Sequence, residues 1–460
     1  MKLGIIGCGG IAYRFAKAAA AHGDIELAVA AREVERARDF ALKVGETVTT
    51  AYGGYKAMLD NELLDGVYIA LPHHLHYEWV EICLERGIPV LCEKPMVLTE
   101  SDAKHLFEIA KKHNTLLVEA MWSKMLPGFK QAKEWIAAGK IGRPLLIDSH
   151  FGIHMPFDET NRYYNKSLAG GALFDLGVYN IHFSCGLLDE YPIQVTGSAH
   201  ISKTGVDEHN HFELHFNSGA VARASSSFYA QTDRLGTIYG TKGSMTFSSF
   251  YEPKTVTVYN EQGRATDRYE ADDTDGFVHE VAHFVSLIQA GKKESDLVRP
   301  NDTIACARIF DNLNQQWGIQ VTGQRGEEMK TAIKVLVVDD VSMMRRTLKK
   351  VLVDHCGVDE LNIREASKGS EALACYREMS PELVLLDITL KAESGLDVLD
   401  KLLELDPEAH IVMCTASVER AVVMDSVRRG AKGYVLKPAG ESALKAVVEE
   451  LKPQHPEKFS

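Results

Sequence analysis

The sequence predicts an α/β protein of three domains: a parallel sheet flanked by helices, an α+β domain with a large open antiparallel sheet, and a smaller β/α domain. Short buried strands alternate with helical stretches over about the first 120 residues. From Ile193 to Tyr259 the apolar residues follow the period of two that is typical of half-buried strands. After Ile333, four apolar strands end in residues that carry chemistry. The predicted domains are residues 1–122, 123–320 and 333–453, joined by a linker at 321–332.

Composition restricts the possible partners and the compartment. The formal net charge of −13 over 460 residues argues against binding to nucleic acid or to a membrane surface. No apolar run approaches the roughly 20 residues of a membrane span. The first residues are predicted to form a strand, so a signal peptide is not expected. The eight cysteines form no Cys-x-x-Cys pair. We therefore expect no disulfide framework, and we expect a cytoplasmic location.

The first predicted strand, Leu3–Ile6, leads into the motif G-x-G-x-x-A formed by Gly7, Gly9 and Ala12. Glycines allow a backbone to approach a pyrophosphate, and the helix that follows supplies free N–H groups. A tight structural turn is the alternative for such a motif taken alone. Its place one strand from the start, followed by alternating strands and helices, favours a dinucleotide site.

The second predicted strand, Glu26–Ala31, indicates which dinucleotide is bound. An NAD site would place an acid near the end of this strand, to bond the ribose hydroxyls. Here the strand ends in Arg32, with Arg36 one helical turn later. Two guanidinium groups suit the 2′-phosphate of NADP, which arginine can bind in a bidentate manner. The alternative is that both arginines belong to a solvated helix face.

Two further strands are predicted to end at the same edge. The strand Gly66–Leu71 is followed by a histidine cluster, Pro72 to His76. No carboxylate or thiol lies at metal-ligand spacing around it, so His76 is predicted to contact the cofactor or to start a helix. The apolar run Val90–Cys92 stops at Glu93, Lys94 and Pro95. Because ligands of open α/β sheets bind beyond the carboxyl ends of the strands, Lys94 is predicted to lie over a ligand crevice.

In order and spacing, these motifs together with Glu119 to Trp122 resemble the glucose–fructose oxidoreductase/inositol dehydrogenase (Gfo/Idh/MocA) family over about residues 1–325. Residues 29–32, 90–95 and 170–179 are most similar to its dihydrodiol dehydrogenases and NADP-dependent sugar dehydrogenases. The resemblance implies a Rossmann domain, a cis Lys94–Pro95 bond, and hydride transfer between NADP and a vicinal hydroxyl of a sugar, polyol or trans-dihydrodiol. It also implies a homo-oligomer formed through the free face of the antiparallel sheet. The implied coenzyme contacts are Gly7, Gly9, Ile11, Ala12, Arg32, Arg36, Leu71, His73, His76, Glu93, Lys94 and Trp122.

A predicted helix over 172–183 places Asp175 and Tyr179, four residues apart, on one face. Family members of the dihydrodiol type carry tyrosine at the position of Tyr179, whereas many others carry histidine. The resemblance therefore implies a catalytic role for Tyr179. A free tyrosine has a pKa of about 10, and the ammonium of Lys94 is expected to lower it, with Asp175 orienting one of the two. The alternative is a core tyrosine with a satisfied hydroxyl. Trp122, Phe151, His154 and Phe277 are predicted to line a substrate pocket or to pack in the core.

The last domain delivers polar groups to one sheet edge. Its four strands end in Asp339 and Asp340, in Asp387, in Thr415 and in Lys437. Three carboxylates cannot stay ionised together without a cation, and oxygen ligands with room for water suit Mg²⁺. Asp387 is predicted to be the in-line nucleophile toward a phosphoryl group that the metal and Lys437 neutralise.

This block resembles the receiver domain of response regulators of the single-domain chemotaxis type, a flavodoxin-like (βα)5 fold. The resemblance implies that Asp387 is the phospho-acceptor, and that a sensor histidine kinase or a small phosphodonor is the partner. It implies Mg²⁺ ligands at Asp339, Asp340, Asp387 and the carbonyl of Thr389, and a responding pair of Thr415 and Tyr434. A cis Lys437–Pro438 bond is also implied.

Three arrangements of these domains are compatible with the sequence. Phosphorylation of Asp387 could tune a dehydrogenase, or two independent modules could be joined by nature or by engineering. Met329-Lys330 resembles the start of a free receiver, which favours independent modules. In the third arrangement the first half is a binding scaffold for a signalling protein. The presence of Lys94 and Tyr179 argues against that arrangement.

Overall fold

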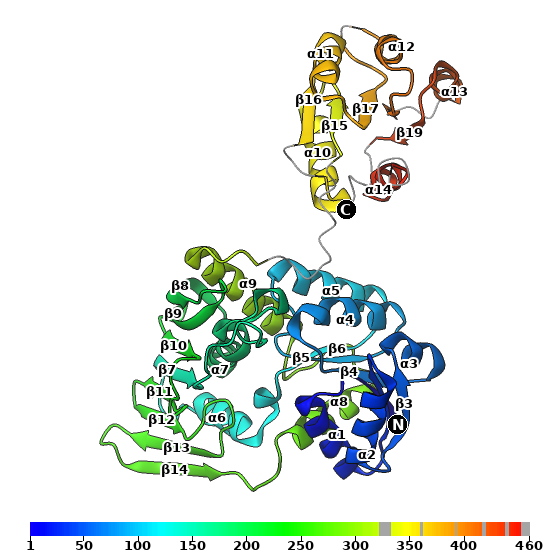
Figure 1. Ribbon diagram of the computed structural model, residues 1–460. Coiled ribbons are helices and arrows are strands. Elements are labelled where there is room, and N and C mark those ends of the chain that lie inside the picture. Colours follow the sequence, from blue (N-terminus) through cyan, green and yellow to red (C-terminus); the bar gives the residue numbers. More distant parts are fainter. Residues whose placement is uncertain (322–332, 359–361, 392, 416–419, 438–440, 452–460) are drawn as a thin grey trace. The chain divides into compact units, whose positions relative to one another are not determined.

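The computed structural model describes residues 1–321, 333–358, 362–391, 393–415, 420–437 and 441–451. The chain divides into two compact units, Met1–Arg325 and Gly326–Ser460 (Figure 1). Residues 322–332 of the predicted linker and the Lys437–Pro438 bond lie outside the described residues. None of the described helices combines the length and the apolar character that a membrane span requires.

The first unit begins with the predicted doubly wound domain. Its six strands are all parallel, in the order β3-β2-β1-β4-β5-β6. The strands are β1 (Lys2–Ile6), β2 (Glu26–Ala31), β3 (Val48–Gly53), β4 (Gly66–Ile69), β5 (Val90–Glu93) and β6 (Leu117–Ala120). The helices are α1 (Gly10–His22), α2 (Val34–Val44), α3 (Tyr55–Asn61), α4 (His76–Glu85) and α5 (Glu100–Lys112). Strands β4, β5 and β6 are buried along their whole length, as expected for parallel strands between two layers of helices.

The turn after β1 requires glycine. Gly7 has φ +102°, and a Cβ atom added to it would lie 2.5 Å from the carbonyl oxygen of Ala70. Helix α1 then starts without a side-chain cap and without an acid in its first turn, which leaves backbone N–H groups free. A Cβ atom added to Gly9 or Gly10 would meet nothing within 4 Å. Space for a ligand therefore lies directly over this helix end.

The second half of this unit is built on an eight-stranded sheet, in the order β14-β13-β12-β11-β7-β10-β9-β8. The strands are β7 (Pro144–Gly152), β8 (Pro192–Ile201), β9 (Asp207–Phe216), β10 (Val221–Ser227), β11 (Gly236–Gly240), β12 (Gly243–Phe247), β13 (Thr255–Asn260) and β14 (Ala265–Glu270). The sheet is open, as predicted, but mixed, because β7 and β10 run parallel. The predicted sheet starts at Ile193 and so lacks β7. A long crossover follows β7, and parallel pairing requires such a connection.

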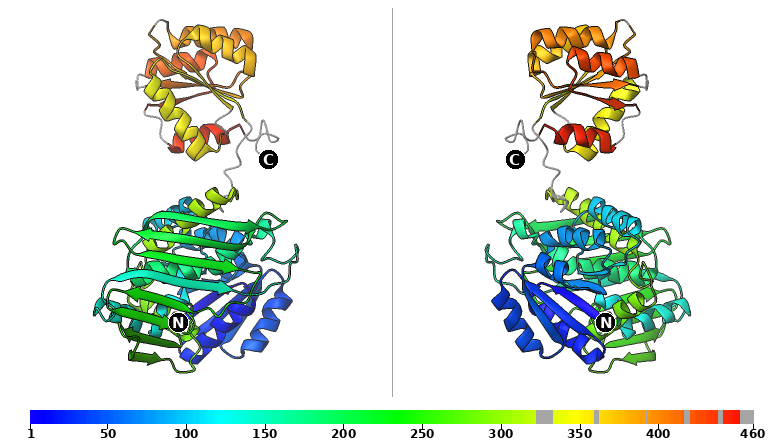
Figure 2. Two further views of the ribbon diagram at one scale, coloured as in Figure 1. Left: turned by 90° about the vertical axis from the view of Figure 1, so that its left-hand side faces the viewer. Right: turned by 90° about the vertical axis from the view of Figure 1, so that its right-hand side faces the viewer.

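Helices cover one face of this sheet. They are α6 (Pro127–Ala137), α7 (Val178–Leu188) and α9 (Pro300–Trp317), whereas α8 (Phe277–Gln289) packs against α1 and β4 of the first domain. None of the described helices lies on the other face (Figure 2, left). It is polar at its centre, where Arg223 binds Asp148 and His211 is exposed. Pairing of this face with a second subunit stays a prediction, which the mass of the native protein in solution would check.

The second unit contains a five-stranded parallel sheet in the order β16-β15-β17-β18-β19, which confirms the predicted β/α domain. The strands are β15 (Val335–Val338), β16 (Ile363–Ala366), β17 (Leu383–Asp387), β18 (Ile411–Thr415) and β19 (Gly433–Leu436). The helices are α10 (Ser342–Cys356), α11 (Gly369–Met379), α12 (Gly395–Leu405), α13 (Arg420–Arg429) and α14 (Glu441–Glu449). Strands β15 and β17 are fully buried, and they therefore hold in place the polar residues at their carboxyl ends.

Candidate functional site

Lys94 lies at the carboxyl end of β5, and its bond to Pro95 is cis, as the family resemblance implied. Its Nζ donates a hydrogen bond to the backbone carbonyl of Asp175 over 2.8 Å. The same atom lies 4.6 Å from the ring centroid of Tyr179. The structure therefore brings Lys94 from the Rossmann domain against Asp175 and Tyr179 from the second half of the unit.

Asp175 lies in a π-helical turn, Leu173–Gly177, that precedes α7, where the sequence predicts a regular helix. Such turns are frequent at functional sites because they change which groups a helix presents. The carboxylate accepts a hydrogen bond from Nη2 of Arg162 over 3.1 Å, and Nζ of Lys94 lies 3.9 Å from it. Burial opposes ionisation, but the charges of Lys94 and Arg162 outweigh it and hold the pKa of Asp175 below its usual value.

Tyr179 is buried, and its hydroxyl oxygen accepts a hydrogen bond from Nε1 of Trp122 over 3.1 Å. Burial, followed by the charge of Glu93, raises the pKa of Tyr179 well above its usual value. The structure differs here from the expectation that Lys94 lowers this pKa. The reason is geometric: the ammonium packs over the ring face and donates to Asp175 rather than to the phenol oxygen. Tyr179 is therefore a protonated phenol, able to donate a proton.

A buried carboxylate connects the two catalytic candidates. Glu119 accepts hydrogen bonds from the backbone N–H of Met96 over 2.9 Å and from Oγ1 of Thr303 over 2.8 Å. Nε2 of His182 lies 3.4 Å from the same carboxylate. Met96 follows the cis proline, and His182 lies one turn after Tyr179 on α7, so Glu119 joins the Lys94 loop to the Tyr179 helix. Sequence reasoning used Glu119 only as part of a family motif.

The histidines after β4 have partners within the protein. Nδ1 of His76 is 2.9 Å from the carbonyl oxygen of Pro95, and Nε2 is 2.8 Å from that of Leu71. Both ring nitrogens thus contact backbone, and α4 begins at this residue, so the predicted helix-start role fits the structure better than coenzyme contact. His73 is buried beside Asp175, and burial lowers its pKa to about 3. It is therefore neutral.

The remaining coenzyme candidates surround the glycine turn. Ile11 is exposed at the start of α1, and Leu71 is half-buried close to Gly7. Arg32 and Arg36 are exposed, and both charges act on the half-buried Tyr55.

The charge of Arg36 reaches Cys8 in the glycine turn. Burial raises the pKa of the Cys8 thiol to about 11, and the charge of Arg36 partly offsets this effect. A dinucleotide with a phosphate on its ribose fits this combination of free N–H groups, open space and nearby guanidinium groups. Glu93 is buried and accepts a hydrogen bond from the hydroxyl of Tyr68, which gives it a structural contact.

Asp207 of β9 is a positioning residue that sequence reasoning missed. Its Oδ2 accepts hydrogen bonds from the backbone N–H of Leu173 over 2.8 Å and from Nδ2 of Asn210 over 2.7 Å. Leu173 starts the π-helical turn that carries Asp175. Burial raises the pKa of Asp207 to about 7. A lone acid at the start of a strand offers no sequence signal for this role.

We predict that Asp207→Asn removes a pH-dependent part of the stability. The folded pKa of about 7 lies above the unfolded value, so the stabilisation is present at low pH and lost as pH rises through 7. Wild type should lose roughly 2–3 kcal/mol of unfolding free energy from this group between about pH 5 and pH 8. Urea denaturation followed by tryptophan fluorescence measures this loss. Asp24→Asn, at an exposed acid, is the control; equal pH dependence in wild type and Asp207→Asn would contradict the assignment.

The strand ends of the second unit converge as predicted. Carboxylate oxygens of Asp339, Asp340 and Asp387 lie within 4.8 Å of one another. Nζ of Lys437 is 2.5 Å from Oδ2 of Asp339 and 2.8 Å from Oδ2 of Asp387. The backbone N–H of Thr389 donates to Oδ1 of Asp387 over 3.3 Å. Lys437 and the exposed Lys391, whose Nζ lies 3.7 Å from Oδ2 of Asp340, still leave the three carboxylates with an excess of negative charge, and these hard oxygen donors suit Mg²⁺.

The charges of this cluster depend on one another. Burial raises the pKa of Asp387, and Lys437 only partly offsets that effect. Burial opposes the charge of Lys437, but hydrogen bonds to Asp339 and Asp387 outweigh it and raise the lysine pKa. Thr415 ends β18, although its side chain lies outside the described part of the chain. Tyr434 on β19 is exposed.

Comparison with known families confirms the sequence resemblances. Residues 1–120 match the oxidoreductase family with an NAD-binding Rossmann fold, and residues 129–246 match the GFO/IDH/MocA C-terminal domain. Residues 335–449 match the response regulator receiver domain.

Individual proteins are similar to the first unit. The trans-1,2-dihydrobenzene-1,2-diol dehydrogenase of Xenopus laevis is 31% identical over 300 residues, which cover 64% of this chain and 90% of that protein. The D-xylose 1-dehydrogenase (NADP(+)) 2 of Haloferax volcanii is 29% identical over 317 residues, covering 68% and 95%. The crystal structure of a 3-ketoreductase from Actinomadura kijaniata in complex with NADP and TDP-benzene superposes with a TM-score of 0.62 at 25% identity, covering 68% and 97%.

Proposed function

The chain belongs to the Gfo/Idh/MocA oxidoreductase family and carries a fused response regulator receiver domain, and from this premise we propose the activity of each unit. The first unit transfers hydride between NADP and a vicinal hydroxyl group of a sugar, a polyol or a trans-dihydrodiol. The second accepts a phosphoryl group on Asp387. The names of the similar diol and xylose dehydrogenases support this choice of substrate class.

The observation that carries the hydride-transfer proposal is the contact between Nζ of Lys94 and the ring of Tyr179, 4.6 Å from its centroid. NADP, when bound, supplies the hydride acceptor or donor. The ammonium of Lys94 polarises the substrate oxygen and stabilises negative charge on it. Tyr179 donates a proton to that oxygen in carbonyl reduction, and in alcohol oxidation its phenolate form, which the raised pKa makes the minor form, takes the proton back. Asp175 holds the ammonium through its backbone carbonyl.

We predict that Lys94→Met lowers kcat by about 10²–10⁴-fold, because charge stabilisation at the reacting oxygen is lost. Tyr179→Phe should lower kcat by a similar factor, since proton transfer then depends on water. Lys17→Met, at an exposed lysine on α1, should leave turnover unchanged. The measurement is NADP reduction at 340 nm with a panel of vicinal diols and sugars. Wild-type kcat in the Lys94 variant would refute this chemistry.

Coenzyme choice is assigned to Arg32 and Arg36, whose exposed guanidinium groups lie beyond the second strand. Arg32→Ser should raise the KM for NADP about 10–100-fold and leave the KM for NAD unchanged, because a charge-assisted hydrogen bond to the 2′-phosphate is lost. Arg38→Ser is the matched control: Arg38 is exposed on the same helix and lies 4.0 Å from Glu35. An equal loss for both coenzymes would count against the 2′-phosphate assignment.

The convergence of three carboxylates with Lys437 supports the receiver proposal. Asp339, Asp340, Asp387 and the carbonyl of Thr389 would hold Mg²⁺, which neutralises charge on the transferring group. Lys437, already 2.8 Å from Asp387, would pair with the phosphoryl oxygens. A sensor histidine kinase or a small phosphodonor would supply the phosphoryl group.

We predict that wild type incorporates phosphate from acetyl phosphate with Mg²⁺, and that Asp387→Asn does not, because the acceptor oxygen is lost. Asp397→Asn, at an exposed acid on α12, should label like wild type, and chelation of Mg²⁺ should abolish labelling. Phosphate-affinity electrophoresis measures the product. Alkali-labile label in Asp387→Asn would refute the acceptor assignment.

Dehydrogenase turnover of the phosphorylated wild type distinguishes a regulated dehydrogenase from two independent modules. Turnover that changes after phosphorylation would favour a regulated dehydrogenase. Turnover that is identical before and after would favour two independent modules, which the free-receiver character of Met329-Lys330 supports.

A further inference from the structure

One fully buried glutamate of the first unit has no hydrogen-bond donor for its side chain. Glu280 lies on the buried face of α8, one turn after Phe277 and one turn before Phe284. Neither of its carboxyl oxygens has a hydrogen-bond partner among the described residues. A buried polar group that gives up water without finding another partner costs free energy, so most such groups are hydrogen-bonded. A buried carboxyl group without a partner is therefore unusual.

Another buried carboxyl group of the same unit shows what Glu280 lacks. Burial opposes the charge of Glu119, but contact with His182 and hydrogen bonds from a backbone and a side-chain donor outweigh it and hold the pKa of Glu119 below its usual value. Burial, followed by the charge of Glu93, raises the pKa of Glu280 well above its usual value. Both effects favour the protonated acid over the carboxylate.

Glu93 is also buried, but it has two donors. It accepts a hydrogen bond from the hydroxyl of Tyr68, whose ring stacks on Phe15 of α1 at a centroid distance of 3.8 Å. The backbone N–H of Lys94 donates to its other oxygen over 3.2 Å. Burial raises the pKa of Glu93, and these contacts partly offset the effect. Hydrogen bonds to the ionised form favour that form, so Glu93 loses its proton before Glu280 does.

The contacts of α8 lead from Glu280 to the catalytic candidates. The ring centroid of Phe277 lies 5.6 Å from that of Trp122, whose indole nitrogen donates to the hydroxyl of Tyr179 over 3.1 Å. Burial, then the charge of Glu93 and, more weakly, that of Glu280 oppose ionisation of Tyr179. A phenolate at Tyr179 and a carboxylate at Glu280 would be two negative charges in a buried region, where screening is weak. Ionisation of one group therefore disfavours ionisation of the other.

Two further charged groups act on Glu280, and they oppose each other. Nη2 of Arg14 on α1 donates to Oδ1 of Asp275 over 2.9 Å. After burial, the charge of Arg14 lowers the pKa of Glu280 and that of Asp275 raises it. Lys124, on the short helix before α6 that packs against α8, binds Asp302 instead. These groups thus do not replace the donors that Glu280 lacks.

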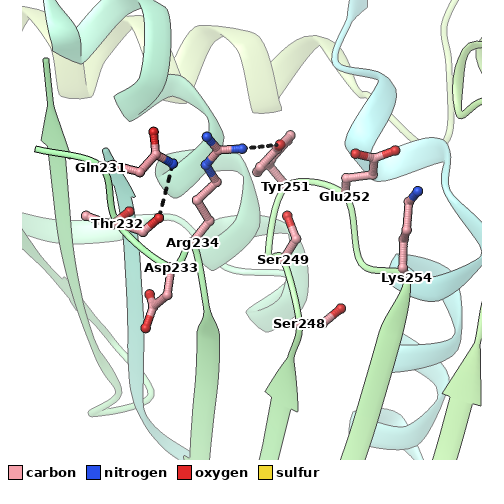
Figure 3. A pocket seen from close by; sticks show the side chains of 9 residues that line it. All are labelled: Gln231, Thr232, Asp233, Arg234, Ser248, Ser249, Tyr251, Glu252 and Lys254. Carbon is pink, nitrogen blue, oxygen red and sulfur yellow. Dashed lines mark hydrogen bonds between the residues drawn. The ribbon is translucent and has the colours of Figure 1, made fainter. Parts of the chain in front are cut away.

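The open side of Tyr179 carries balanced charge. The ring of Tyr251 meets that of Tyr179 edge-on at 5.6 Å and lines a hollow of about 440 Å³ (Figure 3). The charged residues of this hollow are two acids and two bases, Asp233, Glu252, Arg234 and Lys254. The buried side instead holds carboxyl groups in excess. Protonation on the buried side therefore sets the net charge that Tyr179 experiences.

We propose that Glu280 is a positioning residue that holds a proton at neutral pH and thereby limits the negative charge around Tyr179. The phenolate form of Tyr179, which takes up the substrate proton in alcohol oxidation, then forms beside the carboxylate of Glu93 alone of this buried pair. Loss of the Glu280 proton raises the pH at which that phenolate forms. The inference rests on the proposed hydride transfer and adds a residue that acts through Tyr179.

The pH profile of alcohol oxidation tests this role. The ratio of kcat in Glu280→Gln to kcat in wild type should rise about 3- to 10-fold between about pH 7 and pH 10, because the glutamine never adds a negative charge. Glu280→Asp keeps an ionisable group and should show no such rise. Glu108→Gln, at an exposed glutamate on α5, is the control. A ratio for Glu280→Gln that stays constant with pH would overturn the proposal.

Two spectroscopic measurements on the full chain need no substrate. The infrared difference between wild type and Glu280→Gln at about pH 7 should contain the carbonyl stretch of a protonated carboxylic acid. A carboxylate band in its place would overturn the inference. If Glu280→Gln does not fold, Glu280→Met, which is uncharged and of similar length, takes its place.

The ultraviolet absorbance of tyrosinate, taken as the difference from the matching Tyr179→Phe variant, follows Tyr179 alone. Its titration should move to lower pH by about 0.5–1 pH unit in Glu280→Gln. This shift, found without any reduction of NADP by the panel of diols and sugars, would support the role of Glu280 and overturn only the hydride-transfer proposal. An unchanged titration would overturn the role of Glu280 even in an active dehydrogenase.

Discussion

The first unit depends on one buried ammonium group. The side chain of Lys94 is 12% exposed, and among the described residues no carboxylate oxygen comes closer to its Nζ than the 3.9 Å to Asp175. The charge is instead compensated by a backbone carbonyl, a more distant carboxylate and the face of an aromatic ring. Such shared compensation stabilises the charge but leaves the ammonium able to interact with an oxygen brought by a ligand. A close ion pair would leave the ammonium less able to interact with such an oxygen.

The surroundings of Lys94 follow from this constraint. The ammonium is placed correctly only if the loop after β5 and the turn before α7 keep their relative positions. Glu119 fixes the loop through Met96 and approaches α7 through His182. Asp207 fixes the start of the turn through Leu173. Both carboxylates are buried, and each accepts hydrogen bonds from a backbone donor and a side-chain donor.

The receiver unit uses a lysine at a strand end in a different way. Lys437 makes close contacts with Asp339 and Asp387, so its charge is largely compensated by carboxylates. Those carboxylates outnumber it, which leaves the cluster able to take a divalent cation. The first unit thus presents a largely buried cation at its sheet edge, whereas the second presents an excess of carboxylates. Two similar sheet edges therefore carry sites of opposite charge.

The sequence by itself determined the local features of this protein. Each of these features depends on periodicity or on backbone conformation, so it can be recognised from residues that are neighbours in the sequence. They are the alternating buried strands and helices, the glycine turn after β1, the acids at the strand ends and the family motifs. The doubly wound domain and the β/α domain were predictable on that basis, whereas the pairing of Lys94 with Tyr179 was expected only from the family resemblance. Arg32 and Arg36 were likewise recognisable from their place after the second strand.

Only the tertiary structure decided how distant residues modify one another. The pKa of Tyr179 is raised rather than lowered because burial and the direction of the Lys94 ammonium are set by packing between two halves of a unit. The parallel position of β7, the two backbone contacts of His76 and the support from Asp207 have the same origin. Each joins residues that no local pattern links, since their proximity arises only when the chain has folded.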